Sequence, residues 1–443
     1  MKRSLIFAAL LSLGCIIASA QPPQSVTGLS PSAEAQLQTA ISDKTTAQIN
    51  FSRKPPFVRG IHLTSWVAGS KKARVYTDTV LNETEVNTVV IDMKEYRGEV
   101  YVKGVKEADE MKTYVSAVPD LKEYLASLKA RGIYTVARIV CFKDDLMARR
   151  RPEWAVKSSS GGIWLDRSKN AWLDPFNKNN WHYLISIAKE CAAAGFEEIQ
   201  FDYIRFPSDG NIKLCRYSKP HTPESAGQAL HGFLTEAYSQ LKPLNVDVSI
   251  DIFGLVTTDT HDMGIGQKLL NLTESVDYVC PMVYPSHYNP GEYNLADPDL
   301  SPYETVYYSL NGAKKRLGES FKKLRPYLQD FSLKHHYGAK QVRDQIQAAY
   351  DNDIGDWILW NPRCKYTMAA LKPKQFSTVI EKSNRPAPKA RSVSGQPQVS
   401  SSTLKAADLN VEKSSGTENT NVQPLQNPAT SYLSPETTPQ IKQ

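Results

Sequence analysis

Cysteine is scarce in this sequence, and no two cysteines stand at a motif spacing. The 443 residues include six cysteines, and Cys15 lies inside the apolar N-terminal run. The other five are an odd number without a C-x-x-C pair or histidines at zinc-binding spacing, which excludes a disulfide framework. They are Cys141, Cys191, Cys215, Cys280 and Cys364. Several sit in apolar segments and are expected to be buried thiols.

An excess of one charge and a second long apolar segment are also missing. The formal net charge is +7, with basic residues interleaved among acidic ones. Because nucleic-acid binding needs basic residues clustered on one face, no nucleic-acid partner is expected. Beyond the first 20 residues no run of 18 apolar residues exists, so no transmembrane segment remains after signal cleavage. With 41% hydrophobic and 22% charged residues, the composition is that of a soluble globular protein.

The first 20 residues combine a basic start, an apolar run and the small residues Ala18, Ser19 and Ala20. This pattern predicts a signal peptide over residues 1–20 and a secreted, periplasmic or cell-envelope protein. A lipoprotein acylated at Cys15 is the alternative. It fits less well, because Ser12 stands where leucine is usual and an apolar stretch follows the cysteine.

Composition divides the rest of the chain into three parts. Residues 21–56 are rich in Gln, Ser, Thr, Pro and Ala and predict a low-complexity linker. Residues 380–443 are rich in Ser, Pro and Gln with almost no aromatics, so they cannot offset the entropy of ordering and predict a disordered tail. The folded body therefore spans residues 57–379.

Within the body, short β-branched and aromatic runs alternate with helical patterns. The predicted strands are Gly60–Thr64, Thr88–Asp92, Tyr134–Ile139, Glu198–Tyr203, Asp247–Ile252, Tyr278–Val283, Arg325–Gln329 and Asp356–Trp360. The predicted helices include Leu121–Arg131, Trp181–Ala194, Ser225–Leu241, Pro302–Leu317 and Lys340–Asn352. This alternation predicts an α/β fold, a (β/α)8 TIM barrel with enlarged loops on its C-terminal face. A doubly wound open sheet is the alternative, but no glycine-rich phosphate loop follows any strand.

The fourth predicted strand ends in a conspicuous polar segment, FDYIRFP, at residues 201–207. Alternation along the strand places Asp202 on the same face as Gln200. An ionised aspartate on an inward face is costly unless a partner compensates it, and Arg205 is the partner expected from proximity. Either this pair merely pins the loop, or Asp202 is a carboxylate held ionised in a cleft.

Other predicted strands also end in polar residues. Asp92 and Lys94 share one face and are expected to pair, Arg138 is a cation in an apolar run, and Asp251 and Asp330 close two later strands. In a TIM barrel these ends meet at one rim. Acids and cations gathered there are better explained by a functional site than by separate stabilising pairs.

Two carboxyl groups in one cleft suit cleavage of a glycosidic bond. One must be protonated to release the sugar oxygen, and the other must stay charged. Asp202 is the predicted charged group. Asp251 is the predicted acid, because its apolar neighbours and the lack of an adjacent cation should raise its pKa. The candidate catalytic residues are Asp202, Asp251, Asp330 and Asp92.

Aromatic residues near these strand ends favour a sugar ligand, since sugar faces stack on aromatic rings. The loop after the third strand carries Trp154, Trp164 and Trp172, which either bind sugar or form a small core over the barrel end. The candidate substrate-binding residues are Arg205, Lys94, Arg138, Tyr284, His287, Trp172 and Trp360. His287 is equally well explained as a structural hydrogen-bonding residue. No histidine pair has a catalytic metal spacing, and no G-x-S-x-G motif is present.

Several long motifs resemble one family. They are RGIHLTS at 59–65, VIDMK at 90–94, FDYIRFP at 201–207, PMVYPSHY at 281–288 and LQDF at 328–331. In this order they resemble the "putative glycoside hydrolase domain" family of bacterial exported proteins, over residues 57–371. The resemblance implies a TIM barrel related to α-amylase-like and α-galactosidase-like hydrolases, with Asp202 in the place of the nucleophile. In amylase-like relatives the acid is a glutamate after strand five, where this chain has Asp251, so the acid stays open.

The sequence therefore predicts an exported glycoside hydrolase that cleaves a polysaccharide or oligosaccharide and needs no cofactor and no metal. A non-catalytic carbohydrate-binding barrel of the cell envelope is the second hypothesis. A zinc-dependent polysaccharide deacetylase is a third.

Overall fold

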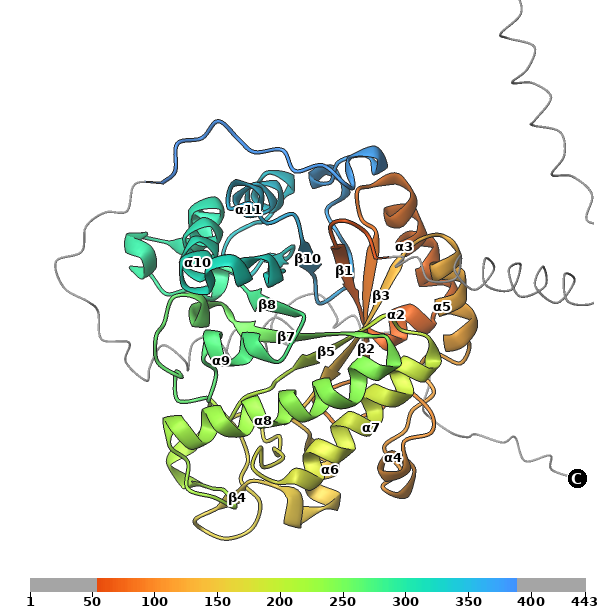
Figure 1. Cartoon of the computed structure of the whole chain (residues 1–443), viewed down its shortest axis with the longest axis vertical. Helices are drawn as coiled ribbons and strands as arrows, with labels where there is room; N and C mark the ends of the chain where they lie inside the picture. The colour runs from red at the N-terminus through yellow and green to blue at the C-terminus, as the bar shows by residue number, and fades with distance from the viewer. Residues whose placement is uncertain (1–53, 389–443) are drawn as a thin grey trace, which may run out of the picture. The chain divides into compact units, whose positions relative to one another are not determined.

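The computed structural model describes residues 54–388, and its centre is a closed parallel barrel (Figure 1). The barrel strands are β1 (Arg59–Leu63), β2 (Thr88–Lys94), β3 (Tyr134–Val140), β5 (Glu198–Asp202), β7 (Asp247–Phe253), β8 (Tyr278–Met282), β9 (Tyr327–Gln329) and β10 (Trp357–Trp360). The barrel closes where β1 pairs with β10 in parallel. The predicted TIM barrel is confirmed.

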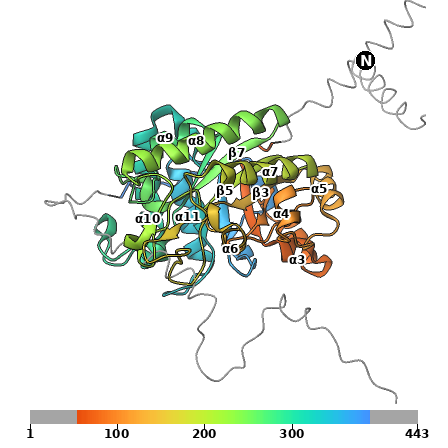
Figure 2. The same ribbon diagram turned by 90° about the horizontal axis from the view of Figure 1, so that it is seen from below.

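Helices surround the barrel. They are α2 (Ser65–Gly69), α3 (Lys71–Glu83), α4 (Lys106–Glu110), α5 (Leu121–Ala130), α6 (Asp145–Arg150), α7 (Lys178–Ala194), α8 (Pro223–Leu241), α9 (Leu269–Glu274), α10 (Pro302–Leu317) and α11 (Ala339–Asp351). Figure 2 shows α7 and α8 side by side over β5 and β7. Thr222 caps α8 by accepting from the Ser225 N–H, and Gly195 ends α7 with a left-handed backbone, as its position after the apolar run predicts.

The barrel interior has an apolar middle layer between two polar ends. Alternate residues of the strands point inward, and Val90, Val136, Tyr327 and Ile358 pack there into a buried cluster with Cys280. The inward residues that precede these along the strands form a polar floor, and those that follow form a polar mouth. A site at the mouth is therefore separated from the floor by close-packed side chains.

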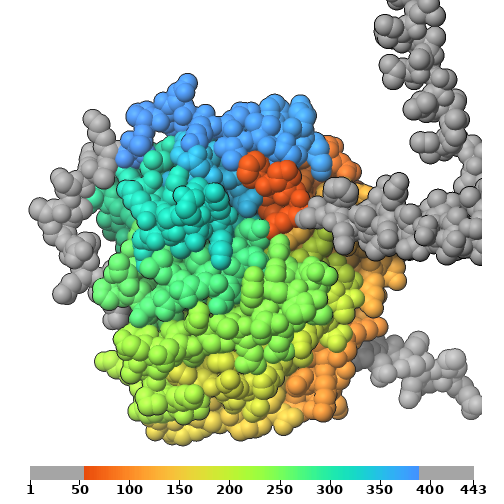
Figure 3. All heavy atoms as spheres, in the orientation of Figure 1, coloured from red at the N-terminus to blue at the C-terminus, as the bar shows by residue number. Residues whose placement is uncertain are grey.

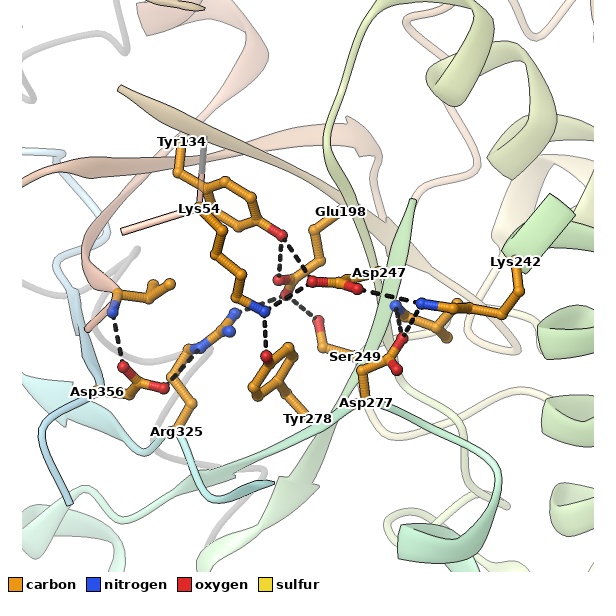
Figure 4. A network of polar contacts seen from close by, with 12 residues as sticks. Lys54, Tyr134, Glu198, Lys242, Asp247, Ser249, Asp277, Tyr278, Arg325 and Asp356 are labelled. Carbon is orange, nitrogen blue, oxygen red and sulfur yellow. Dashed lines mark hydrogen bonds and ion pairs between the residues drawn. The ribbon is translucent and has the colours of Figure 1, made fainter. Parts of the chain in front are cut away.

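The floor is a charged network at the N-terminal ends of the strands (Figure 4). Glu198 and Arg325 form an ion pair of 2.7 Å, and both side chains are fully buried. The hydroxyls of Ser249 and Tyr134 donate to Glu198 at 2.6 and 3.0 Å. Lys54 reaches the edge of this network, where its Nζ lies 2.7 Å from Asp247 Oδ2. Interactions at this end of a TIM barrel serve stability.

The loops after β3 and β5 meet in a small antiparallel pair, β4 (Lys157–Ser158) with β6 (Cys215–Arg216). Trp164 and Trp172 are buried beneath it. The Trp164 indole donates to the Asn211 carbonyl at 3.0 Å, and the Trp172 indole donates to Asp166 at 3.0 Å. Of the two interpretations of the tryptophan loop, the small core over the barrel end describes these two residues.

The two ends of the described chain meet on one face. Arg59 pairs with Glu85 and also donates to the carbonyls of Phe376 and Val379. Figure 3 shows the red first residues beside the blue C-terminal part. Residues 381–388 belong to the predicted tail, yet Ser383 donates to Asp351 through its backbone N–H at 2.7 Å.

Predictions for residues 1–53 and 389–443 fall outside the described residues. These include the signal peptide, most of the linker and most of the tail. Within residues 54–388, no helix is long and apolar enough to cross a membrane. The five cysteines after the first are buried free thiols.

Candidate active site

Arg138 of β3 is the centre of the barrel mouth. Its Nη1 donates to Asp92 Oδ1 at 2.6 Å, and its Nε donates to Asp202 Oδ2 at 3.0 Å. A second nitrogen of the same guanidinium, Nη2, also binds Asp202 Oδ2. Asp251 Oδ2 lies 3.7 Å from Nε. One rigid, always charged fork thus gathers carboxyl groups from β2, β5 and β7.

The carboxyl groups of Asp202 and Asp251 are close neighbours. Because Asp202 Oδ2 and Asp251 Oδ2 lie 3.0 and 3.7 Å from the same nitrogen, they are separated by no more than 6.7 Å, the sum of the two distances. Two carboxylates this close cannot both ionise without cost. The candidate acids from β5 and β7 therefore share one electrostatic site.

Asp202 is fixed at a sharp end of β5. The next residue, Tyr203, has φ of +51°, a left-handed conformation that is uncommon for a non-glycine residue. This turn brings the Tyr203 N–H to 2.6 Å from Asp202 Oδ1. Arg138 of the neighbouring strand binds Asp202, and the predicted pairing of Arg205 with Asp202 stays a prediction.

Arg205 has a different environment. Its guanidinium lies 4.9 Å from the ring centres of Trp172 and Tyr203 and 4.6 Å from that of Phe253. It also donates to Ser208 Oγ at 3.0 Å. At Tyr203 the backbone leaves the extended conformation of β5, so spacing along the strand no longer indicates which side chains meet. Arg205 thus packs among the aromatic rings on this side of the mouth.

Asp92 binds three groups. Besides Arg138, His62 Nε2 lies 2.8 Å from Asp92 Oδ2, and the carboxyl of Glu95 hydrogen-bonds Asp92. The predicted pair of Asp92 with Lys94 is wrong. The β2–β3 register shifts between these two residues, and the bulge turns Lys94 away.

Lys94 is instead fully buried against Asp144. Its Nζ lies 2.8 Å from Asp144 Oδ2 and donates to the Val140 carbonyl at 2.8 Å. Asp144 in turn caps α6 by accepting from the Met147 N–H at 2.8 Å. The Lys94 ammonium thus joins two strands to the following helix, and its buried position gives it no access to a ligand.

Asp251 is deeply buried beside Arg138. Burial raises its pKa well above the usual value, and the charge of Asp202 raises it further against the opposing effect of Arg138. Within residues 54–388, Asp251 Oδ1 has no hydrogen-bond partner. Gln267 supports this strand end by accepting from the Phe253 N–H at 3.0 Å. Burial beside Asp202 thus shifts the pKa of Asp251 in the direction that the sequence predicts and favours its protonated form.

Glu95 is a fourth acid at the mouth that sequence reasoning missed. It follows the end of β2 directly and is half-buried. Burial raises its pKa to about 8, and the charge and hydrogen bond of Asp92 act in the same direction. The signal available in the sequence was a further acidic residue directly after VIDMK, but without the bulge nothing indicated that its side chain faces the mouth.

His62 of β1 and Trp360 of β10 lie side by side at the mouth. Their rings stack with centres 3.9 Å apart, and Arg138 lies 5.1 Å from the Trp360 ring. Burial lowers the pKa of His62 well below its usual value, and the positive charge of Arg138 lowers it further. His62 is therefore neutral. Trp360 offers a partly exposed aromatic face next to the carboxyl groups.

Tyr284 and His287, the predicted sugar contacts after β8, lie together. Their ring centres are 5.4 Å apart, and Phe331 packs against both rings. Burial raises the pKa of Tyr284, and the charges of Asp251 and Asp202 raise it further. Ser286 Oγ lies 3.0 Å from His287 Nδ1.

Two other predicted residues have structural partners. Both carboxylate oxygens of Asp330 accept from Thr367, from its N–H at 2.7 Å and its Oγ1 at 2.6 Å. Asp330 thus fixes the segment after β10 and does not bind Arg138. Trp172 is buried and packs against the Tyr203 ring at 6.0 Å, so it supports the turn that follows Asp202.

In the part of the chain that the structure describes, no three or more His, Cys, Asp or Glu side chains are arranged to hold a metal ion. At the mouth the guanidinium of Arg138 takes the central place that a cation would need. Four carboxyl groups, one guanidinium and one neutral histidine form a site that holds protons on some acids and charge on others. This is the class of site that enzymes with this fold build at the barrel mouth.

Comparison with known proteins agrees with that class. Residues 60–366 match the family described as "Putative glycosyl hydrolase domain", and the chain belongs to this family. It is thus a TIM-barrel member of a glycoside hydrolase family. No curated protein matches the chain.

Among solved structures, the glycoside hydrolase domain of PgaB (BpsB) from Bordetella bronchiseptica is similar in fold. Its identity is 12%, its TM-score is 0.53, and the match covers 72% of this chain and 99% of that one. A hypothetical protein from Ruminiclostridium thermocellum is 36% identical over 43% of this chain and 96% of its own, with a TM-score of 0.39. A chitinase from Chromobacterium violaceum is 12% identical over 71% and 98%, with a TM-score of 0.41.

Proposed function

We propose that this protein hydrolyses a glycosidic bond of a polysaccharide or oligosaccharide by a two-carboxyl mechanism, outside the cytoplasm. The observation that carries the proposal is the single guanidinium of Arg138 shared by Asp202 and Asp251. Arg138 and the Tyr203 N–H both donate hydrogen bonds to the Asp202 carboxyl group. In the same site, burial raises the pKa of Asp251 and so favours its protonated form.

Asp202 is the group that attacks or stabilises the sugar carbon. The positive charge that develops there lies against a carboxylate fixed by three hydrogen bonds, so little reorganisation is needed during reaction. A protonated carboxyl group of the same cluster donates to the departing oxygen. Asp251 is the donor proposed from the sequence, and its burial supports a protonated state.

Sugar binding falls to aromatic and polar groups around the acids. Trp360 and His287 are half-exposed, and Tyr284 is buried beside His287 after β8. Lys94 and Trp172 are buried and contribute only by holding the strand ends. We therefore propose Trp360, Tyr284 and His287 as the contacts that orient the ring.

The experiment that tests the function is a screen for release of reducing ends. Purified residues 21–443 would be incubated with peptidoglycan, α-glucans and galactans, alongside Asp202→Asn. We expect the wild type to release reducing ends from one class, and Asp202→Asn to bind that glycan without turnover. Binding without release by both proteins would contradict hydrolysis and favour a carbohydrate-binding barrel.

Export is the part of the proposal that rests on residues 1–20 alone. We expect the mature protein recovered from its host to begin at Gln21, because Ala18, Ser19 and Ala20 form the cleavage site. N-terminal sequencing tests this. A mature chain that begins at Cys15 with an acyl group would show a lipoprotein instead.

A further inference from the structure

We propose that Glu95 is the proton donor of this site, an inference that rests on the proposed glycosidic hydrolysis. Glu95 lies at the C-terminal end of β2 and hydrogen-bonds Asp92. Asp92 binds Arg138, which in turn binds Asp202. The charged carboxylate and the proposed donor thus belong to one continuous network.

The Glu95–Asp92 contact itself requires a proton. Two carboxyl groups can hydrogen-bond only if one of them is protonated, because two carboxylates have no donor between them. Asp92 already accepts from Arg138 Nη1 at 2.6 Å and lies 2.8 Å from His62 Nε2. Burial raises the pKa of Asp92, but Arg138 and the hydrogen bond with Glu95 lower it, whereas the same hydrogen bond raises the pKa of Glu95. The shared proton therefore belongs to Glu95.

Access distinguishes Glu95 from the other acids. The exposed fractions of Asp92, Asp202 and Asp251 are 0, 3 and 1%, whereas Glu95 is half-buried. A general acid must come within hydrogen-bond reach of the departing oxygen. Among these four acids, Glu95 is the one whose side chain is not fully buried.

The two ends of the guanidinium separate the two roles. Asp202 binds the Nε and Nη2 edge of Arg138, with Asp251 beside it, and Asp92 binds Nη1. Glu95 hydrogen-bonds Asp92 at the Nη1 end of the guanidinium. The charged carboxylate and the donor thus lie at opposite ends of this planar group, and the two groups that cleave a glycosidic bond must lie on either side of it. Asp251 lies at the same end as Asp202, where its proton limits the repulsion between these two groups.

The surroundings of Glu95 suit reversible proton transfer. The titratable and charged groups that face it are Asp92, His62, Arg138, Tyr101 and Cys364. With burial and Asp92 raising its pKa to about 8, Glu95 is protonated at neutral pH and can still release its proton.

The reaction then balances in two steps. In the first, the Glu95 proton passes to the departing oxygen as the bond from that oxygen to the sugar carbon breaks, and Asp202 bonds or stabilises that carbon. In the second, water gives its hydroxyl to the carbon and its proton to the Glu95 carboxylate, which restores both groups. No other reactant is needed.

The test compares Glu95→Gln and Asp251→Asn on two aryl glycosides of the sugar found in the screen. A phenyl leaving group needs a proton, and a 2,4-dinitrophenyl group does not. We expect Glu95→Gln to lower kcat/KM on the phenyl glycoside by about 10²-fold or more. On the dinitrophenyl glycoside its kcat/KM should stay within about tenfold of the wild-type value. The fall in the wild-type rate near pH 8, where Glu95 loses its proton, should be absent from this variant.

Glu99→Gln is the matched control, since Glu99 lies in the same loop and binds the Tyr101 hydroxyl at 2.8 Å. The ratio of its kcat/KM to the wild-type value should be the same on the two substrates. Equal losses of kcat/KM on both substrates in Glu95→Gln would overturn the assignment. So would a large loss on the phenyl glycoside alone in Asp251→Asn. In either case Asp202→Asn would still test the hydrolysis. A wild type inactive on every glycoside would overturn the hydrolysis, and the Glu95 role with it.

Discussion

Arg138 is one positive charge among four carboxyl groups, and this ratio controls the chemistry of the mouth. It contacts Asp92, Asp202 and Asp251 directly. Burial raises the pKa of Asp92, Asp251 and Glu95, and Arg138 opposes the shift in each case. The site therefore holds charge at some acids and protons at others, which general acid catalysis beside a charged carboxylate requires.

Replacement of Arg138 should be costly. Arg138→Met leaves carboxylates buried without their cation, and we expect the free energy of unfolding at pH 7 to fall by about 3–5 kcal/mol. Urea unfolding measures this. Arg131→Met is the control, because Arg131 and Asp78 form an exposed pair on the surface, for which a loss of less than about 1 kcal/mol is expected. Similar losses in both variants would contradict a central role for Arg138.

The raised pKa of Asp251 makes stability depend on pH. The folded protein holds the Asp251 proton at pH values where the unfolded chain has released it. Stability is thus lost as pH rises above the unfolded pKa of about 4, by up to about 1.4 kcal/mol per pH unit for one proton. Asp251→Asn lacks this titration.

We therefore expect the difference in unfolding free energy, Asp251→Asn minus wild type, to grow between pH 5 and pH 8. Urea titrations at several pH values measure it. A difference that stays constant over this range would show that Asp251 has the same pKa in both states.

At the scale of elements, the ends of two strands explain what sequence reasoning could and could not reach. All eight strands and the barrel follow from the alternation of apolar runs and helical patterns, with ends off by one or two residues. The convergence of Asp92, Arg138, Asp202 and Asp251 follows from the barrel topology. Their partners do not, because the bulge after Asp92 and the left-handed turn at Tyr203 redirect the side chains that follow.

Helix α3 shows another limit of the sequence pattern. Its β-branched residues Val75, Thr77, Thr79 and Val80 weaken the helical signal of this segment. Packing of Thr77, Val80 and Leu81 against the barrel decides its structure.

Two glycines give a test of element packing. A methyl group at Gly227 in α8 would meet nothing within 4 Å, whereas at Gly254 after β7 it would lie 2.3 Å from the Tyr288 hydroxyl and 2.6 Å from the Met282 carbonyl. We expect Gly227→Ala to stabilise the protein by about 0.5–1 kcal/mol and Gly254→Ala to destabilise it by about 1–3 kcal/mol. Thermal unfolding of both variants and the wild type measures these changes in stability. Destabilisation by Gly227→Ala would show that α8 is packed differently.

At the scale of the whole molecule, the barrel separates stability from chemistry. The floor network of Figure 4 and the acids of the mouth lie at opposite ends of the strands, with an apolar layer between them. The family match over residues 60–366 spans both ends. A change in the floor should therefore alter folding and leave the reaction intact.

Glu198→Gln tests this separation. It removes the charge that pairs with Arg325, and we expect the free energy of unfolding to fall by about 3–5 kcal/mol with kcat unchanged. Lys242→Met is the control at the half-exposed rim of the same network, with an expected loss of at most about 1 kcal/mol. A large fall in kcat of the folded Glu198→Gln protein would mean that the floor and the mouth are coupled.

The central claim is that acids from separate strands meet on Arg138 to hydrolyse a glycosidic bond. Its most direct test is the rate of reducing-end release by Asp202→Asn and wild type on the same glycan, with folding checked by unfolding in urea. We predict a fall in kcat of about 10³-fold or more in a folded variant that still binds the glycan. A folded Asp202→Asn protein that turns over at the wild-type rate would contradict the claim.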